Sequence, residues 1–239
     1  MLRRERAWIG ARELSLAAWS LVCLGCGTST SNGPLSYVER EVGEGASAER
    51  PLIVALHGRG DRPERFADVF DGFDRDARVL LVRAPIDEGR GRAWFVFRWG
   101  FERAMDDVDA LLPRLARTVE SDRSAHPTRG RPIVVGFSQG AMIAYAWASR
   151  RPDELRASIP ISGGMPERYF PRRGARLPPI RAIHGTRDEV IEPAWSRTSV
   201  AELRARGADA TLAEVEGAPH WMTPPMCEAL FDALRAVLD

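Results

Sequence analysis

The chain has 239 residues, of which 44% are hydrophobic and 28% charged, and its formal net charge at pH 7 is +1. These values are typical of a soluble globular protein with one well-buried domain, and so small a net charge gives no reason to expect a nucleic-acid partner. All 34 basic residues are arginines, which excludes chemistry that needs a lysine, such as a Schiff base or a Ser–Lys dyad.

The first 25 residues have the pattern of a secretory signal peptide. Residues 1–12 are rich in arginine, residues 14–25 carry no charge, and small residues follow. Twelve uncharged residues are too few to cross a bilayer core of roughly 30 Å as a helix. We therefore expect export in a bacterium, to the periplasm or to a membrane anchor. An amphipathic N-terminal helix on a cytoplasmic enzyme is the alternative.

The sequence LGC at 24–26 resembles the end of a lipoprotein signal, in which Cys26 would become the lipidated first residue and attach the protein to a membrane. Cys23, however, stands where such signals usually carry leucine. Residues 26–36 would then form a polar tether. A lipidated Cys26 leaves Cys227 without a partner, so no disulfide framework is expected. With four histidines and no HExxH motif, a zinc site is not expected either.

From residue 37 to 239 short apolar strands alternate with longer helical patterns, as in a single domain with a mostly parallel central sheet and helices on both faces. Strands are expected at 37–43, 51–56, 79–84, 132–137, 157–162, 180–185 and 211–216, and helices at 101–122, 139–150, 193–206 and 224–238. Pro113 is expected to bend the first of these helices or to lie near a break in it.

Three polar residues follow three of the predicted strands, in the order Ser138, Asp188, His220. The carboxyl ends of parallel strands meet at one edge of a sheet, so the three side chains are expected to converge. A serine hydroxyl needs a histidine to accept its proton and a carboxylate to orient that histidine. Glu189, Glu192 and Glu216 compete with Asp188 for the role of the acid, and Asp188 as a surface turn residue is the structural alternative.

Gly136 and Gly140 flank Ser138 in GFSQGAM, between a strand and a helix. Two residues without side chains permit a sharp turn that exposes the serine hydroxyl at a helix N-terminus. The order of the three residues and this turn predict a serine nucleophile.

An oxyanion intermediate needs backbone N–H donors, which we expect from Gln139 and from Arg59 in the glycine-containing loop 57–61. The aromatic stretch 89–101 either packs in the core or supplies Trp94 and Phe95 to a substrate pocket, with Met165 and Trp221 as further lining candidates. Arg90, Arg92 and Arg98 either meet an anionic substrate or are solvated. Of the remaining histidines, His57 is expected to shape its loop, His184 to be buried and structural, and His126 to be solvated.

At this point the chain resembles the α/β-hydrolases of the phospholipase/carboxylesterase group, which includes acyl-protein thioesterases and small bacterial esterases. The matching segments are LHGRGD (56–61), AWF (93–95), GFSQGAM (136–142), SGGMP (162–166), HGTRDEVI (184–191) and GAPHWM (217–222). The resemblance implies an α/β-hydrolase fold and hydrolysis of small-molecule or lipid carboxylic esters or thioesters. It also implies a Ser138–Asp188–His220 triad, oxyanion donors at Arg59 and Gln139, and no cofactor.

The leading hypothesis is a serine esterase that works through an acyl-enzyme. One alternative is a peptidase of the same fold, although the chain is short and has no large extension. The other is a lipid-anchored binding protein that has the fold but no turnover, against which the complete set of three residues argues.

Overall fold

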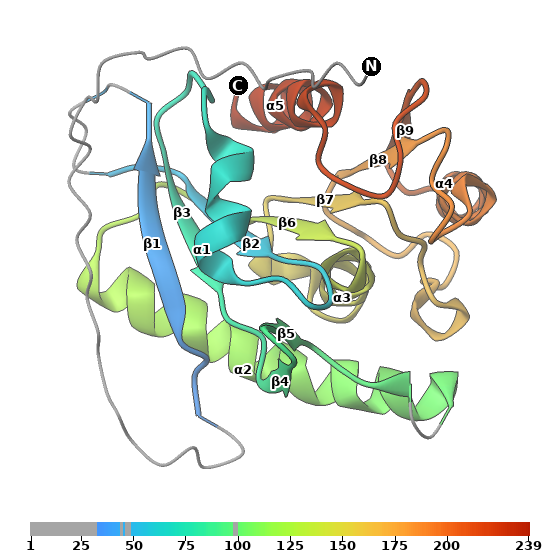
Figure 1. The fold of residues 1–239 in the computed structure, drawn as a ribbon, viewed down its shortest axis with the longest axis horizontal. Helices are drawn as coiled ribbons and strands as arrows, with labels where there is room; N and C mark the ends of the chain where they lie inside the picture. The colour runs from blue at the N-terminus through green and yellow to red at the C-terminus, as the bar shows by residue number, and fades with distance from the viewer. Residues whose placement is uncertain (1–32, 44, 46–48, 98–99) are drawn as a thin grey trace, which may run out of the picture.

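A computed structural model describes residues 33–43, 45, 49–97 and 100–239. Its main element is a seven-stranded sheet in the order β1-β3-β2-β6-β7-β8-β9 (Figure 1). Only the pairing of β1 with β3 is antiparallel within this sheet; all the other pairings are parallel. The strands are β1 (Tyr37–Val42), β2 (Leu52–Leu56), β3 (Ala77–Val82), β6 (Ile133–Phe137), β7 (Ala157–Ile161), β8 (Ile180–Gly185) and β9 (Ala210–Val215).

The inner strands are apolar because both of their faces are covered. Every residue of β2, β3 and β7 is buried. β9, at one edge of the sheet, contains polar residues, and only one of its six residues is buried. The expected mostly parallel sheet with helices on both faces is therefore confirmed.

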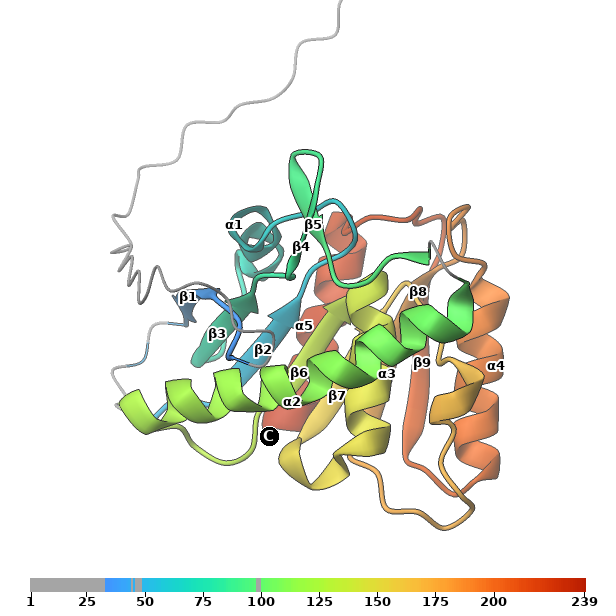
Figure 2. The same cartoon turned by 90° about the horizontal axis from the view of Figure 1, so that it is seen from below.

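Two hydrophobic clusters lie on opposite faces of the sheet. One packs α2 (Phe101–Ala125), α3 (Gln139–Arg150) and α4 (Pro193–Ala205) against it, through residues such as Leu115, Trp147 and Leu203. The other packs α1 (Pro63–Phe66), η1 (Ala67–Phe70) and α5 (Pro224–Leu238), through residues such as Phe70 and Leu234. Figure 2 shows α2 and α3 in front of the sheet and α1 and α5 behind it.

Pro113 lies inside α2, which continues to Ala125, so the proline does not end the helix. Proline has no N–H to donate to the carbonyl of residue 109, and the helix loses one backbone hydrogen bond there. Nine buried residues along α2 keep it on the sheet.

Several short elements were not predicted. A two-stranded hairpin, β4 (Ile86–Glu88) and β5 (Gly91–Ala93), falls in the aromatic stretch and the residues before it. Two single 3-10 turns, η3 (Pro152–Glu154) and η4 (Glu167–Tyr169), lie in connections. Elements of three or four residues carry too little hydrophobic periodicity to be recognised from sequence.

The predicted signal peptide, and Cys26 with it, lies outside the described residues. Residues 33–36, which the sequence assigned to the end of the tether, are held by the domain: the Leu35 N–H donates to Thr118 Oγ1 at 2.8 Å, and the Arg83 N–H to the Ser36 carbonyl at 2.8 Å. Residues 33–36 thus pack with the domain that follows them. In the described ranges, no helix is long and apolar enough to cross a membrane.

Candidate active site

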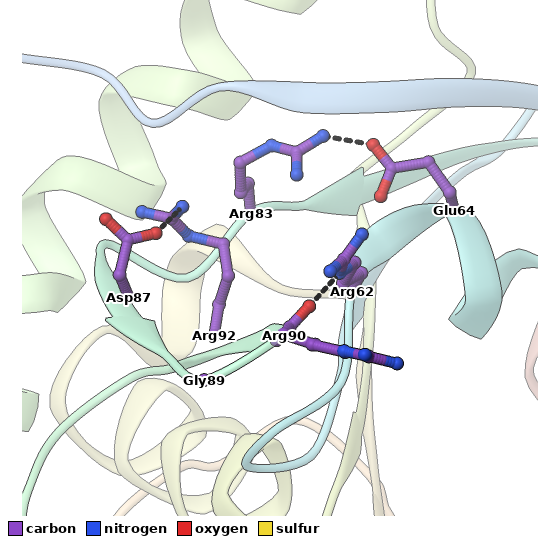
Figure 3. A pocket seen from close by; sticks show the side chains of 8 residues that line it. Arg62, Glu64, Arg83, Asp87, Gly89, Arg90 and Arg92 are labelled. Carbon is purple, nitrogen blue, oxygen red and sulfur yellow. Dashed lines mark hydrogen bonds and ion pairs between the residues drawn. The ribbon is translucent and has the colours of Figure 1, made fainter.

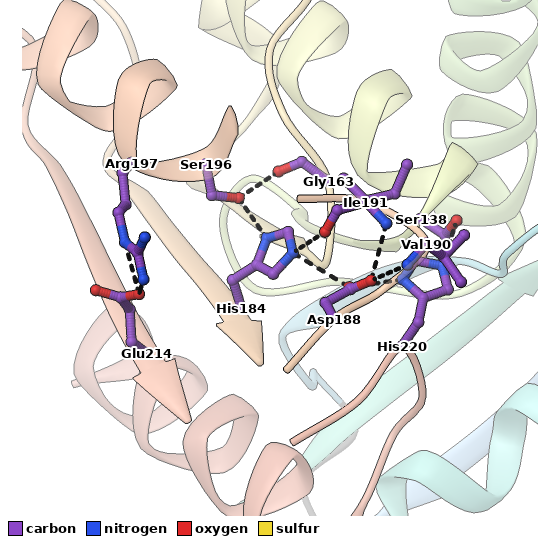
Figure 4. A network of polar contacts seen from close by, with 10 residues as sticks. All are labelled: Ser138, Gly163, His184, Asp188, Val190, Ile191, Ser196, Arg197, Glu214 and His220. Atoms are coloured by element: carbon purple, nitrogen blue, oxygen red, sulfur yellow. Dashed lines mark hydrogen bonds and ion pairs between the residues drawn. The ribbon is translucent and has the colours of Figure 1, made fainter. Parts of the chain in front are cut away.

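Three loops at one edge of the sheet bring Ser138, Asp188 and His220 together, after β6, β8 and β9 respectively (Figure 4). His220 Nε2 lies 3.0 Å from Ser138 Oγ, although the two residues are 82 positions apart in the chain. His220 Nδ1 lies 2.6 Å from Asp188 Oδ2. Because a carboxylate only accepts hydrogen bonds, these contacts assign the proton of neutral His220 to Nδ1 and leave Nε2 to accept the Ser138 O–H.

The turn at Ser138 is strained, with φ 55° and ψ −113°. A side chain at either flanking glycine would collide with backbone. A Cβ on Gly136 would lie 2.1 Å from the Gly140 carbonyl oxygen, and one on Gly140 would lie 2.1 Å from the Leu56 carbonyl oxygen. The glycines are therefore needed for close approach, and the strain at a non-glycine residue is typical of a nucleophile held between a strand and a helix.

Asp188 is buried, and both of its oxygens are occupied. Oδ1 accepts the N–H groups of Val190 at 3.0 Å and Ile191 at 2.8 Å, and Oδ2 faces His220. Burial by itself raises the pKa of Asp188, but the hydrogen bonds from His220 and from Ile191 outweigh it, so the pKa is lowered. The competing acids Glu189, Glu192 and Glu216 are all exposed, and Asp188 is the acid that contacts His220.

The loop 57–61 runs beside Ser138. A Cβ on Gly58 would lie 3.4 Å from Ser138 Cβ, and the Arg59 side chain is turned to Glu88, with Nε 2.7 Å from Oε1. Gln139 is the first residue of α3, so its backbone N–H has no partner within the helix. The assignment of the Arg59 and Gln139 N–H groups as oxyanion donors stays a prediction.

Comparison with known proteins identifies the family. The model of the phospholipase/carboxylesterase family matches residues 38–238. The chain belongs to this family. It is therefore a carboxylesterase-like hydrolase with the α/β-hydrolase fold.

Several relatives of this hydrolase are similar over most of their length. Esterase YpfH of Escherichia coli is 29% identical over 77% of this chain and 82% of its own. An acyl-protein thioesterase 1 homolog of Dictyostelium discoideum is 21% identical over 79% of this chain and 89% of its own. The crystal structure of esterase PE8 superposes with a TM-score of 0.72 and 27% identity, covering 85% of this chain and 99% of that one.

The lining candidates of the hydrolase differ in exposure. Trp94, Phe95 and Met165 are at most 1% exposed and belong to the core cluster under α2 and α3. Trp221, next to His220, is 64% exposed. The core-packing interpretation thus describes Trp94 and Phe95, and a pocket-lining role for any of the four residues stays a prediction.

The side chain of Gln139 holds the aromatic stretch in place, which sequence reasoning did not anticipate. Its Oε1 accepts the Trp94 N–H at 3.0 Å, and its Nε2 donates to the Phe95 carbonyl at 2.9 Å. Trp94 Nε1 in turn donates to the His57 carbonyl at 2.7 Å. The available signal was a glutamine directly after Ser138, between two apolar segments, because amides in such surroundings need partners.

A polar hollow of about 300 Å³ lies beside the β4–β5 hairpin (Figure 3). Arg83 pairs there with Glu64, and Arg92 with Asp87. Its lining is Arg62, Glu64, Arg83, Asp87, Gly89, Arg90, Gly91 and Arg92, and includes none of Ser138, Asp188 and His220. Arg92 also donates to the carbonyls of Ala84 and Pro85, and these contacts tie the hairpin to the end of β3. Arg98 lies outside the described residues.

The other histidines have distinct environments. His57 is fully buried, with Nδ1 2.7 Å from the Gly58 carbonyl, and burial lowers its pKa. His184 is also fully buried, and its Nε2 lies 3.1 Å from Asp188 Oδ2, a contact that the sequence did not reveal. His126 is exposed at the end of α2, with Nδ1 3.4 Å from Asp122 Oδ1.

One cluster has the residue types of a metal site. Ligand atoms of Glu39, Asp122 and His126 lie within 4.8 Å of one another. The Arg78 guanidinium already faces both carboxylates, at 2.7 Å from Asp122 and 3.2 Å from Glu39. Since an arginine is always charged, it supplies the positive charge that these acids require.

Proposed function

We propose that the protein is a serine hydrolase that cleaves carboxylic esters or thioesters through an acyl-enzyme intermediate. The observation that carries this proposal is the continuous contact from Ser138 Oγ through His220 to Asp188. The family and the names of the relatives support an ester as the substrate class.

In the proposed reaction Ser138 Oγ attacks the carbonyl carbon of the ester while His220 Nε2 takes the hydroxyl proton. The ionised Asp188 stabilises the resulting imidazolium and keeps its ring in position. The N–H groups of Gln139 and Arg59 stabilise the negative oxygen of the tetrahedral intermediate. His220 then gives its proton to the leaving alcohol or thiol, and Ser138 keeps the acyl group.

Water completes the cycle. His220 takes a proton from the water molecule as the water oxygen attacks the acyl carbon, and returns that proton to Ser138 Oγ when the carboxylic acid leaves. No redox step or external cofactor is required by this sequence of bond changes.

Exposed apolar side chains support substrates with an apolar part. Phe97, Phe101, Val190 and Trp221 are the exposed large hydrophobic residues of the described chain, at 42%, 39%, 65% and 64%. Val190 is two residues from Asp188, and Trp221 follows His220 directly. We therefore propose small-molecule or lipid esters with an apolar acyl or alcohol group as substrates.

The test uses purified enzyme, Ser138→Ala, and Ser124→Ala as a control, because Ser124 is an exposed serine on α2. A fluorophosphonate probe should label wild type and Ser124→Ala but not Ser138→Ala. Hydrolysis of p-nitrophenyl esters should fall by about 10⁶-fold in Ser138→Ala, as expected for the loss of a serine nucleophile. Esters of increasing acyl length would measure the apolar preference.

The same assay separates the alternatives. Faster cleavage of peptide anilides than of esters would favour the peptidase. A wild-type protein that neither reacts with the probe nor hydrolyses any ester would favour the binding protein. Turnover by Ser138→Ala equal to wild type would refute the proposed nucleophile.

We further propose export with a lipid anchor at Cys26, on the sequence pattern alone. Full-length protein should partition with membranes, and Cys26→Ser should release it. Equal partitioning of the two proteins would refute the anchor.

A further inference from the structure

The Asp188 carboxylate contacts a second imidazole besides His220. His184, the fifth residue of β8, has its Nε2 3.1 Å from Asp188 Oδ2, the same oxygen that lies 2.6 Å from His220 Nδ1 (Figure 4). Both His184 and Asp188 have side chains with no exposed surface. A buried polar chain thus extends the proposed triad by one residue beyond its acid.

The neighbours of His184 determine where its proton lies. Nε2 faces the Ile191 carbonyl at 3.0 Å as well as Asp188 Oδ2, and both are acceptors. Nε2 must therefore carry a hydrogen. Nδ1 lies 2.6 Å from Ser196 Oγ, whose one hydrogen is shared between this nitrogen and the Gly163 carbonyl, also at 2.6 Å. Burial lowers the pKa of His184, which favours the neutral ring protonated on Nε2.

Three elements fix the ring. Ser196 on α4 also lies 2.6 Å from the Gly163 carbonyl, in the loop after β7. The Ile191 carbonyl belongs to the loop that carries Asp188, and the backbone of that loop donates to Asp188 Oδ1. His184 therefore connects β8, α4 and the loop 186–192 at the point where the carboxylate is held.

We propose that His184 is a positioning residue for the triad carboxylate. Its Nε2–H donates to Oδ2, the oxygen that is shared with His220, and stabilises part of the negative charge there. This inference rests on the proposed function of Asp188. Its consequence is electrostatic: Oδ2 shares its charge between two N–H donors, so each donor interacts with it less strongly than it would alone. Loss of the His184 donor makes Oδ2 a stronger partner for His220 and favours the imidazolium form of His220.

Two amide variants separate the roles of the two ring nitrogens. His184→Gln can place an amide N–H near the position of Nε2, whereas the shorter side chain of His184→Asn reaches only the region of Nδ1. Asp188 and His220 are the titratable groups that act on His184 in the described residues; its other partners, Ser196 and Ile191, present neutral groups. Arg197→Gln is the control, because Arg197 follows Ser196 on α4 but forms an exposed pair with Glu214.

The kinetic test measures kcat and the pH profile of kcat/KM with a p-nitrophenyl ester, normalised to sites labelled by the fluorophosphonate. We expect His184→Asn to lower kcat about tenfold, as for other residues that orient a functional side chain. We expect its acidic limb, where the base takes up a proton, to move to higher pH. His184→Gln should restore most of the rate and the wild-type limb, and Arg197→Gln should match wild type.

A second readout does not depend on turnover. The proton between His220 Nδ1 and Asp188 Oδ2 should give a downfield resonance, which should move further downfield in His184→Asn and return in His184→Gln. An unchanged resonance and limb in folded His184→Asn would overturn the inference. Labelling or turnover retained by Ser138→Ala would instead overturn the proposed function, so the two failures are distinguishable.

Discussion

Gln139 has two separate tasks at one position. Its backbone N–H lies at the N-terminus of α3, next to Ser138. Its side chain, which is 3% exposed, forms hydrogen bonds with the backbone of Trp94 and Phe95. The residue therefore couples the proposed oxyanion donor to the segment that packs under it. Any replacement that keeps the backbone but removes the amide tests the second task alone.

Gln139→Met leaves the Trp94 N–H and the Phe95 carbonyl buried without a side-chain partner. We expect the free energy of unfolding to fall by about 1–3 kcal/mol, the usual effect of an unsatisfied buried group. Urea denaturation measures this loss, and fluorophosphonate labelling of the folded fraction should persist because Ser138 is untouched. Ser138→Ala serves as the stability control. A variant as stable as the control would show that water replaces the amide.

The β4–β5 hairpin is the element that supports the loop 57–61 from outside. The Gly60 N–H donates to the Arg92 carbonyl at 2.8 Å, and the Arg92 N–H to the Asp61 carbonyl at 3.0 Å. The contact is close enough that a Cβ on Gly91 would lie 1.9 Å from the Gly60 carbonyl oxygen. Displacement of the hairpin should therefore displace Arg59.

Gly91→Ala should lower kcat about tenfold or more, because small displacements of groups near reacting atoms have large effects on rate. Gly89→Ala is the matched control on the same hairpin: its φ is +57°, but no atom lies within 4 Å of the added Cβ. The control should lose about 1 kcal/mol of stability through backbone strain, with kcat per labelled site unchanged. Equal kcat values for the two variants would contradict the supporting role of the hairpin.

The elements that sequence predicted well are those with a strong repeating pattern. The α3 and α5 bounds agree with the expected ranges, and all seven strands of the main sheet were expected, although β3 begins two residues earlier than 79. The convergence of Ser138, Asp188 and His220 could be predicted because each follows a strand in a parallel sheet. The hairpin and the contact of His184 with Asp188 were not found, because tertiary packing and not local pattern creates them.

At the scale of the whole molecule, a buried ion pair joins the antiparallel edge of the sheet to α2. Arg78 on β3 lies 2.7 Å from Asp122 on α2 and 3.2 Å from Glu39 on β1. Its side chain is 5% exposed and that of Asp122 has no exposed surface. Thr128, in the loop after α2, accepts a further hydrogen bond from Arg78 at 2.8 Å.

Arg78→Met should lower the free energy of unfolding by about 3–5 kcal/mol, because it leaves the Asp122 charge buried without its partner. Adding Asp122→Leu should recover much of the lost free energy of unfolding, since a buried apolar pair has no charge that needs a partner. Urea denaturation of the single and double variants measures both effects. Arg235→Met, which removes a more exposed pair with Asp74, should change stability by about 1 kcal/mol or less. A double variant no more stable than Arg78→Met would contradict the charge argument.

The separation of 82 positions between Ser138 and His220 also has a consequence for folding. Neither residue meets the other until the strands from β6 to β9 have taken their places, since each loop is aimed by a different strand. The rate at which Ser138 becomes reactive toward a fluorophosphonate should therefore measure the rate of the last stage of refolding. Chains that have regained their helical circular dichroism but have not yet completed the sheet should not be labelled by the probe.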